Sequence, residues 1–587
     1  MSHTLSPAFL RLLLLLGAGG LALYLGFARF TPDECTRLVR LTGYWWMLAV
    51  VAGAVTALAW CIRESGADRF WRSVRPERGH AVFLVLLSLW VLALDRPGQK
   101  IMFDEPMLSA TALTMHHERE LGATTRAYPL PGVFTILRTH LDKRPPLFPF
   151  LVATLHDLTG FRLTNAIYVN MAGTVALLWL VWLLGRRYGG SPAAGSVAVA
   201  LLATFPEIGV CATGAGMDQI NLVLLAGAWW VALGYLDRPT PARATLFVFT
   251  VLLLTYSRYE SVLYVAAAGL VWIAGARRRG QWLPETSWAI LPLGLLLYAW
   301  HSTVLSHSPE QWELRAEQTE RFSPAYAAHN LEHAARFLFT PSWSQPNSVL
   351  LSVAGLAGGV WLAIVVLRRR STMERNSATT LVAFGGVITA AFGLLMCYYW
   401  AELDDPIVTR LSLPLHLLLA ILAVSAWREV AATHAPARGW RWPALAVGAA
   451  TVVFTVPAAA LARYSETNLM RKNIEWQQRV VAAQLPAPGL VISNRSPLVW
   501  LSAGIPAISA DRARIRGDEL RWHLQRHSFA SVLVMQRLVT SAETGGWTVD
   551  PLDQLPAGWK LEEVAVHRFG DTLMRISRLD EVPAPAR

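Results

Sequence analysis

The sequence predicts an all-α polytopic membrane bundle with interfacial helices on its outer face and a small C-terminal α/β soluble domain. Of the 587 residues, 54% are hydrophobic and only 16% are charged, whereas a soluble protein carries roughly a quarter charged residues. The apolar residues come in long blocks, such as 8–27 and 41–61, and about 20 apolar helical residues cross a hydrocarbon core. After residue 463 these blocks end, and the tail has the pattern of a soluble domain.

We predict about thirteen transmembrane helices, centred near residues 18, 52, 88, 174, 199, 226, 249, 267, 295, 357, 388, 418 and 452. Alternation then places every Arg-rich loop on one side, as the positive-inside rule expects of cytoplasmic loops. The agreement requires that the short apolar stretch 146–160 does not cross the membrane. The predicted location is a bacterial inner (cytoplasmic) membrane, crossed many times, with the active site and the C-terminal domain on the periplasmic face.

Charge and cysteine content exclude two function classes. The formal net charge of +12 comes largely from arginines in short loops between apolar helices, so the membrane already explains it and no nucleic-acid partner is predicted. The four cysteines, Cys35, Cys61, Cys211 and Cys397, show no metal or redox spacing, which excludes a disulfide or metal framework built from them.

The predicted domains are a transmembrane domain over 1–463 and a periplasmic α/β domain over 464–587. In the first, the outer loops 96–164 and 301–348 are expected to form the active site. In the second, β-like runs at 490–493 and 530–535 alternate with helical stretches such as 517–526, which is the pattern of a small mixed domain.

The first outer loop carries two adjacent carboxylates, Asp104 and Glu105. Acids just beyond a membrane helix are costly unless they are solvated or used, and this pair therefore indicates a catalytic acid–base function. The alternative is structural: Asp104 would cap the helix that follows, in which Pro106 stands near the first turn.

Cations follow at three further places on the predicted outer face. Lys143 and Arg144 precede two prolines, and a compact ammonium on a rigid turn suits a phosphate oxygen, although interfacial snorkelling is the alternative. Arg258 lies at an outer turn, and Arg410 and the acid Asp218 each stand at the start of a helix on the same side. Asp218 as a helix cap and Arg258 as a partner of Glu260 are the structural alternatives, but one anionic-lipid site explains all these residues together.

The order of these elements resembles the GT-C superfamily of membrane glycosyltransferases, and within it the polyprenyl-phosphate-dependent group of aminoarabinose transferases and protein O-mannosyltransferases. That group has an Asp-Glu in the first outer loop, a Lys-Pro-Pro-like turn and a helix ending in Gly-Arg-Arg. The corresponding residues here are Asp104-Glu105, Lys143-Arg144-Pro145-Pro146 and Gly185-Arg186-Arg187, and Glu332-His333-Ala334-Ala335-Arg336-Phe337 resembles an outer-loop Glu-His-x-x-Arg-Phe element. The chain departs from the pattern by the inserted Arg144 and by two additional N-terminal spans.

The resemblance implies an inverting-type transfer of a sugar from a polyprenyl-phosphate donor to an acceptor hydroxyl of a lipid, glycan or protein. Asp104 and Glu105 would be catalytic, Asp218 would be a second acid near the substrate, and the phosphate would be bound by Lys143, Arg144, Arg258, Arg336 and Arg410. The resemblance also suggests a divalent metal ion at Asp142 and His333. A transporter or flippase for a lipid-linked sugar is the alternative function, and it would be expected to show paired halves and broken helices at mid-membrane.

Overall fold

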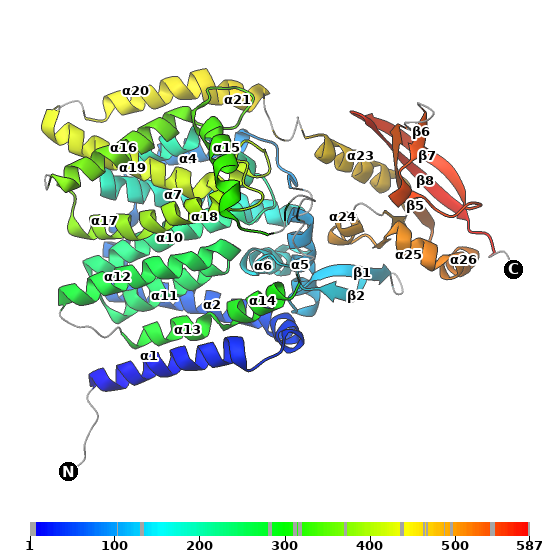
Figure 1. Ribbon diagram of the computed structural model, residues 1–587, viewed down its shortest axis with the longest axis horizontal. Helices are drawn as coiled ribbons and strands as arrows, with labels where there is room; N and C mark the ends of the chain where they lie inside the picture. The colour runs from blue at the N-terminus through cyan, green and yellow to red at the C-terminus, as the bar shows by residue number, and fades with distance from the viewer. Residues whose placement is uncertain are drawn as a thin grey trace, which may run out of the picture. The chain divides into compact units, whose positions relative to one another are not determined.

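The structure is a computed structural model of the chain, shown from the N-terminus in blue to the C-terminus in red in Figure 1. It describes all residues except 1–6, 102–103, 130–133, 280–284, 309–313, 315–317, 319, 369–371, 435–438, 462–463, 465–467, 487, 494–496, 541–545 and 585–587. The chain forms two compact units. Unit 1 comprises Met1–Pro97, Lys143–Phe150 and Ile167–Arg463, and unit 2 comprises Gly98–Asp142, Leu151–Ala166 and Tyr464–Arg587.

Ten helical segments in the described part of the chain are long and apolar enough to cross a membrane. They are α1–η1 (Pro7–Leu23, Tyr24–Ala28), α2 (Pro32–Ser65), α7 (Thr164–Gly189), α10 (Asp218–Asp237), η2–α12 (Tyr259–Leu263, Tyr264–Arg279), η3–α13–α14 (Thr286–Ala289, Ile290–Gly294, Leu296–Ser306), α16 (Val349–Leu367), α17–η6–α18 (Arg375–Thr380, Leu381–Gly385, Gly386–Met396), η7–α19 (Thr409–Ser412, Leu413–His434) and α20–η9–α21 (Arg441–Ala450, Thr451–Thr455, Val456–Leu461). The predicted polytopic helical bundle is confirmed.

The predicted number of spans needs correction. Twelve of the thirteen predicted centres fall in a helix, and Leu295 lies between α13 and α14 of one span. One of the centres lies in the pair α3 (Ala67–Val74) and α4 (Arg78–Ala93), which is bent by 62° and makes an eleventh span only if the pair is counted as one. Two more lie in α8 (Pro192–Ala203) and α11 (Pro241–Thr255), which have only 12 and 15 residues. Prolines begin both helices after Ser191 and Thr240 caps, so the helices are shorter than the apolar runs that contain them.

Small residues allow the helices of unit 1 to approach closely. A Cβ atom on Gly355 of α16 would collide with Leu419 of α19, and one on Gly358 would meet the carbonyl oxygen of Leu422. Such small-residue contacts are the usual means by which helices pack in a bilayer, where apolar side chains gain little by leaving lipid.

The C-terminal part of unit 2 contains a six-stranded sheet in the order β4-β3-β5-β8-β7, with β6 paired to β5. The strands are β3 (Gly489–Ile492), β4 (Ala507–Ile508), β5 (Ser531–Thr540), β6 (Trp547–Val549), β7 (Lys560–Phe569) and β8 (Thr572–Glu581). β3 runs parallel to β4 and β5, and the other pairs are antiparallel. The helices of this part are α23 (Leu469–Gln484), α24 (Pro497–Ser502), α25 (Ala510–Ile515) and α26 (Gly517–Gln525). The predicted small α/β domain is confirmed, and its expected strands and helix correspond to β3, β5 and α26.

Alternate residues of the central strands enter two hydrophobic clusters because successive side chains of a strand point to opposite faces. Val532 and Val534 of β5 pack with residues of α25 and α26, whereas Leu533 and Met535 pack with residues of α23 and α24. Both faces of the sheet are therefore covered.

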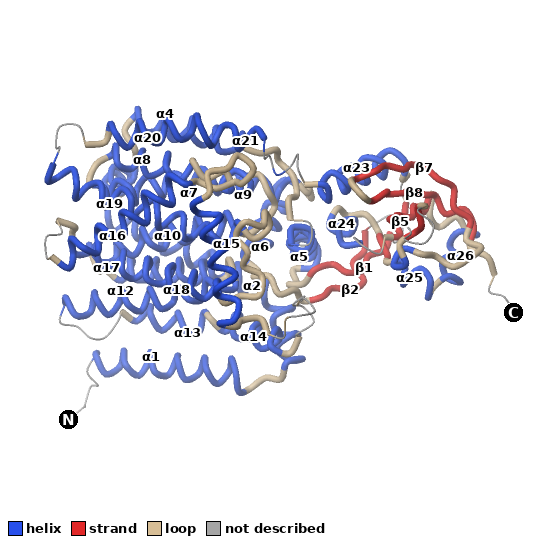
Figure 2. Tube along the Cα trace, turned by 45° about the horizontal axis from the view of Figure 1, so that its top comes forward, coloured by secondary structure: helices blue, strands red, loops and turns tan. Residues whose placement is uncertain are grey.

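Residues 98–142, most of the predicted first outer loop, belong to unit 2 as well. They form α5 (Asp104–Glu118) and an antiparallel hairpin of β1 (Ala123–Pro129) and β2 (Phe134–His140), drawn in red in Figure 2. Ala127 of β1 lies in the same buried cluster as Val491 and Leu533 of the C-terminal sheet. Residues 98–142 therefore pack with the C-terminal domain, although we had expected them to belong to the transmembrane domain. In one contact the hydroxyl of Tyr464 donates to the carbonyl oxygen of Lys100, 364 residues earlier in the chain.

Candidate active site

Three of the predicted site residues meet in the interior of unit 1. Asp218 opens α10, Arg258 lies in the turn between α11 and η2, and Arg410 lies in η7. One carboxylate oxygen of Asp218 pairs with Nη1 of Arg258, and the other lies 3.3 Å from Nη1 of Arg410. All three residues are at most 7% exposed. We call this group the Asp218 triad.

Neighbouring amides fix the backbone that carries the triad. Asn170 of α7 donates through Nδ2 to the carbonyl oxygens of Gly214 and Gly216, at 2.9 and 2.8 Å, and so holds the loop that leads into Asp218. Asn221 donates to the hydroxyls of Ser257 and Ser261, at 2.8 and 2.6 Å, on either side of Arg258. These bonds satisfy buried polar groups and set the positions of the charged side chains.

The triad carries more positive than negative charge. Two guanidinium groups share the Asp218 carboxylate, and the carboxylate of Glu260 lies 2.5 Å from Nε of Arg258. The Glu260 side chain is 39% exposed, so water screens it better than the buried groups. Buried arginines held in place by an acid present a fixed donor array of the kind that binds phosphate.

The Lys143–Arg144 turn is tied to the same region of unit 1. Both side chains are half-buried, and the prolines that follow are buried. At the end of the turn the N–H of Leu147, the first residue of α6 (Leu147–Thr159), donates to the carbonyl oxygen of Tyr256 at 3.2 Å. Tyr256 is two residues from Arg258, so a direct backbone bond joins the two segments that carry the predicted phosphate-binding cations.

The two adjacent acids of the predicted first outer loop have different environments at the start of α5. Glu105 is only 2% exposed, and its carboxylate accepts the backbone N–H of Lys100 at 2.6 Å. Asp104 is half-buried. Both residues belong to unit 2, as does Asp142. The contact of Glu105 holds the chain that enters α5, which makes Asp104 the better candidate for chemistry.

Arg336 and His333 lie on α15 (Ala327–Phe339) and share one acid. Nδ1 of His333 lies 2.6 Å from Oδ1 of Asp404, and Nη1 of Arg336 lies 3.4 Å from Oδ2 of the same carboxylate. Arg336 also pairs with Glu332 at 2.8 Å, and its side chain is 48% exposed. Asp404 therefore orients two predicted site residues.

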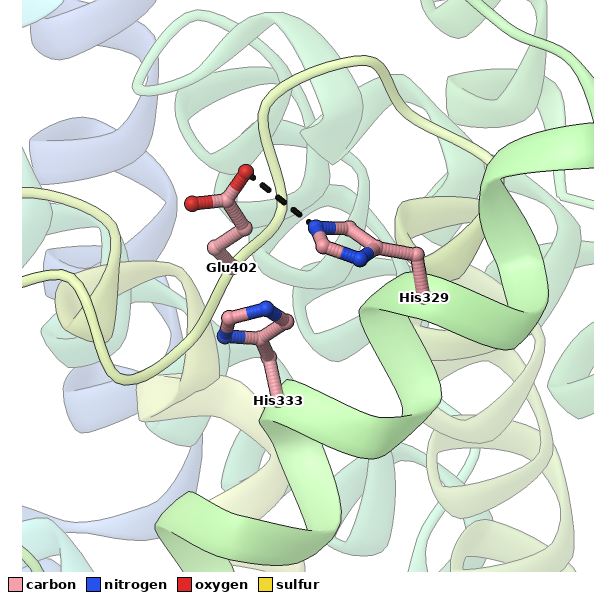
Figure 3. Close-up of side chains that lie close together, drawn as sticks. All are labelled: His329, His333 and Glu402. Atoms are coloured by element: carbon pink, nitrogen blue, oxygen red, sulfur yellow. Dashed lines mark hydrogen bonds and ion pairs between the residues drawn. The ribbon is translucent and has the colours of Figure 1, made fainter.

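The predicted metal pair joins two units, with Asp142 in unit 2 and His333 in unit 1, and it stays a prediction. The group of potential ligands found among the described residues is His329, His333 and Glu402, shown in Figure 3, with ligand atoms within 4.8 Å of one another. Sequence reasoning missed His329 and Glu402. The spacing of His329 and His333, one helical turn apart, was the available signal, because residues four apart lie on one helix face.

A second group of histidines lies in unit 2. His156 on α6 is 2% exposed, and Nδ2 of Asn165 lies 2.8 Å from its Nδ1. Burial, and to a smaller extent the neighbouring His116, lowers the pKa of His156 to about 4. His116 itself lies 2.6 Å from Asp157, which also pairs with Arg119. His156 is therefore neutral at physiological pH.

Part of the sequence matches one protein family, and the fold is similar to several solved structures. The model of the dolichyl-phosphate-mannose-protein mannosyltransferase family matches residues 143–307. Two crystal structures of ArnT from Cupriavidus metallidurans are similar to the chain. The one bound to undecaprenyl phosphate has a TM-score of 0.51 at 12% identity and covers 86% of this chain and 98% of that one. The apo structure has a TM-score of 0.50 at 13% identity, over 86% and 99%.

The oligosaccharyltransferase from Archaeoglobus fulgidus is also similar, with a TM-score of 0.45 at 12% identity over 82% of this chain and 75% of that chain. No curated protein matches the sequence. The likeness to the two ArnT structures shows that the chain has the fold of the GT-C membrane glycosyltransferases. The resemblance drawn from the ordered motifs is thus confirmed.

Proposed function

We propose that this protein is an inverting glycosyltransferase that moves a sugar from a polyprenyl-phosphate donor to a hydroxyl of a lipid, glycan or protein acceptor. The observation that carries the proposal is the Asp218 triad, a buried and partly neutralised pair of arginines within a GT-C fold. One of the similar ArnT structures was determined with undecaprenyl phosphate bound, which supports a lipid phosphate as the anion.

The proposed reaction is a single displacement. The acceptor oxygen attacks the anomeric carbon, the bond from that carbon to the phosphate oxygen breaks, and the lipid phosphate leaves with the bonding electrons. Asp104 takes the proton of the acceptor hydroxyl, which requires hydrogen-bond reach in the substrate complex. Because one face of the sugar is attacked while the phosphate leaves from the other, the anomeric configuration inverts.

The cations stabilise the charge that develops on the leaving phosphate. Arg258 and Arg410 are held by Asp218 before any substrate arrives, so little reorganisation is needed during the reaction, which is the condition for effective electrostatic stabilisation. Lys143, Arg144 and Arg336 are the further phosphate ligands in this proposal. In this proposal the site faces the periplasm of a bacterium, because the positive-inside rule places the loops that carry these residues on the outer side of the membrane.

The test is to incubate purified protein in membranes with a panel of radiolabelled polyprenyl-phosphate sugars and a membrane extract. We expect covalent transfer of label to an acceptor, and a strong loss of transfer in Arg258→Gln. The matched control is Arg238→Gln, an exposed arginine at the other end of α10. Label that crosses the bilayer while still attached to its polyprenyl phosphate would instead indicate a flippase and overturn the proposal.

A further inference from the structure

Two histidines and one glutamate converge at the surface of unit 1. His329 and His333 lie one turn apart on α15, and Glu402 lies in the segment between α18 and η7 (Figure 3). Nε2 of His329 is 3.4 Å from Oε1 of Glu402. One potential ligand atom from each residue lies within 4.8 Å of the other two, a separation that a single ion can span with bonds of about 2.0–2.2 Å after small side-chain rotations.

We propose that His329, His333 and Glu402 bind a divalent transition-metal ion, with zinc as the preferred metal. Two imidazoles and one carboxylate form a donor set that zinc uses at catalytic sites. Magnesium and calcium prefer oxygen ligands, so the two histidines disfavour them. This site goes beyond the proposed glycosyltransferase function and does not depend on it.

The acid beside His333 leaves one ring nitrogen for the metal. Oδ1 of Asp404 lies 2.6 Å from Nδ1 of His333, so the imidazole donates its Nδ1–H to the carboxylate and presents Nε2 as the lone-pair donor. Metal-binding histidines are commonly oriented by such a carboxylate, which fixes the tautomer and raises the basicity of the ligand. Asp404 is thus a positioning residue for the site.

The backbone around the ligands is fixed without a metal. Asn330, between the two histidines in sequence, is 2% exposed and donates through Nδ2 to the carbonyl oxygens of Met396 and Tyr398, at 2.8 and 2.9 Å. These bonds hold α15 against the beginning of the segment that carries Glu402. The ligands from the two elements are therefore brought together by a buried contact, and metal binding needs little ordering of the chain.

The site is open to solvent, and an ion held there would keep one coordination position for another ligand. The side chains of His329, Glu402 and His333 are 58%, 22% and 18% exposed, which gives an ion a path of entry. Three protein ligands leave the fourth tetrahedral position for water or for an anionic oxygen. The segment with Glu402 continues into η7 and Arg410, so a bound ion would fasten to α15 the segment that leads to the Asp218 triad.

The experiment measures metal binding and thermal stability of the full-length protein in detergent. The protein is stripped with a chelator, dialysed against Zn²⁺, Mn²⁺ or Mg²⁺, and analysed for metal content. We expect one zinc per chain, a zinc-dependent rise of the melting temperature because the ion binds only the folded site, and loss of both in His329→Ala and Glu402→Gln. Asp404→Asn should weaken zinc binding by about 10–100-fold, as changes beside metal ligands typically do.

Three controls distinguish this site from other zinc binding. His307→Ala removes an exposed histidine of unit 1, Glu332→Gln removes an exposed acid of α15 itself, and Asp142→Asn removes the acid that the sequence alone had paired with His333. All three should bind zinc like the wild type. Equal zinc content in the wild type and in the His329→Ala/Glu402→Gln double variant would overturn the proposal, and loss of zinc in Asp142→Asn alone would favour the Asp142–His333 pair. Because metal content is measured without a glycosyl donor, failure of the proposed function would leave these results unaffected.

Discussion

The carboxylate of Asp218 lies 3.3 Å from the guanidinium of Arg410, although 192 residues separate the two in the sequence. Both side chains are buried, and Arg258 occupies the other oxygen of the carboxylate. A charge that leaves water must be paired to avoid a large desolvation cost. The acid therefore joins the start of α10 to η7 and fixes the direction of both cations.

Replacing Asp218 by Ala should lower the free energy of unfolding by about 3–5 kcal/mol, because removing one partner leaves buried positive charge uncompensated. The loss can be measured as a shift of the denaturation midpoint in detergent. Glu260→Gln is the control: its side chain is 39% exposed, and exposed pairs are worth about 1 kcal/mol or less. Equal losses in the two variants would contradict a special role for the Asp218 triad.

Replacing Asp104 by Asn should reduce sugar transfer by about 10²–10⁴-fold, because that is the usual cost of losing a general base. Its stability should stay close to that of the wild type, since the side chain is half-buried. Transfer assays and melting curves on the same preparation test both points. A stable Asp104→Asn protein that retains more than about a tenth of the activity would exclude the base role.

Replacing Glu105, the neighbour of Asp104, should affect stability more than sugar transfer. Glu105→Ala removes the acceptor of the Lys100 N–H and should cost about 1–3 kcal/mol of stability, the penalty for leaving a buried donor unsatisfied. Glu105→Gln retains an acceptor oxygen and should be more stable than Glu105→Ala. A loss of transfer without a loss of stability in Glu105→Gln would instead place Glu105 in the chemistry.

Local sequence patterns predicted the positions of helices and strands, because these depend on local composition. Apolar blocks located the helices, and the short β-like run at 530–535 located the central strand β5. The meeting of Asp218, Arg258 and Arg410 was predictable too, because the predicted topology places all three at the same side of the membrane. Apolar content did not distinguish full spans from the shorter α8 and α11, which are equally hydrophobic but begin at prolines.

Contacts between residues far apart in the chain could not be predicted from a single sequence. Nothing in residues 98–142 indicates that Ala127 will pack on a sheet formed after residue 488. Likewise, 73 residues separate His329 from Glu402, and contacts such as the hydrogen bonds of Asn330 to Met396 and Tyr398 hold these elements together. Such contacts depend on tertiary packing, which produces no periodic pattern in the sequence.

Acidification should destabilise the protein through His156. Its pKa is about 4 in the folded state against 6.5 ordinarily, so between these values the unfolded chain binds the extra proton and stability falls as the pH falls. The contribution is on the order of 2–3 kcal/mol. Melting temperatures at pH 7.5 and 4.5 should differ less in His156→Asn, whose amide oxygen can replace the Nδ1 acceptor, than in the wild type. Identical pH profiles would show that His156 is not responsible.

The tail after residue 463 should face the periplasm. The prediction rests on the inside placement of the Arg-rich loops, and it holds if the short helices and the bent pair α3–α4 leave the alternation unchanged. A reporter active only outside the cytoplasm should be active when fused after Ser493 and silent when fused after Arg279. The reverse pattern would mean that the alternation is shifted by one crossing.

Lys143 and Arg336 are predicted to bind the same donor phosphate. Each change to Ala should weaken donor binding, and the double change should cost less than the sum of the two, because a phosphate already misplaced by the first change has less to lose from the second. Arg336 is oriented by Asp404 and Glu332, so Asp404→Asn should also weaken donor binding and should have little further effect once Arg336 is Ala.

The measurement is a double-mutant cycle with a polyprenyl-phosphate sugar in detergent. Additivity to within about 0.5 kcal/mol would indicate independent sites. Lys143 would then be an interfacial side chain on a proline-stiffened turn, and the phosphate would be bound at the Asp218 triad without it.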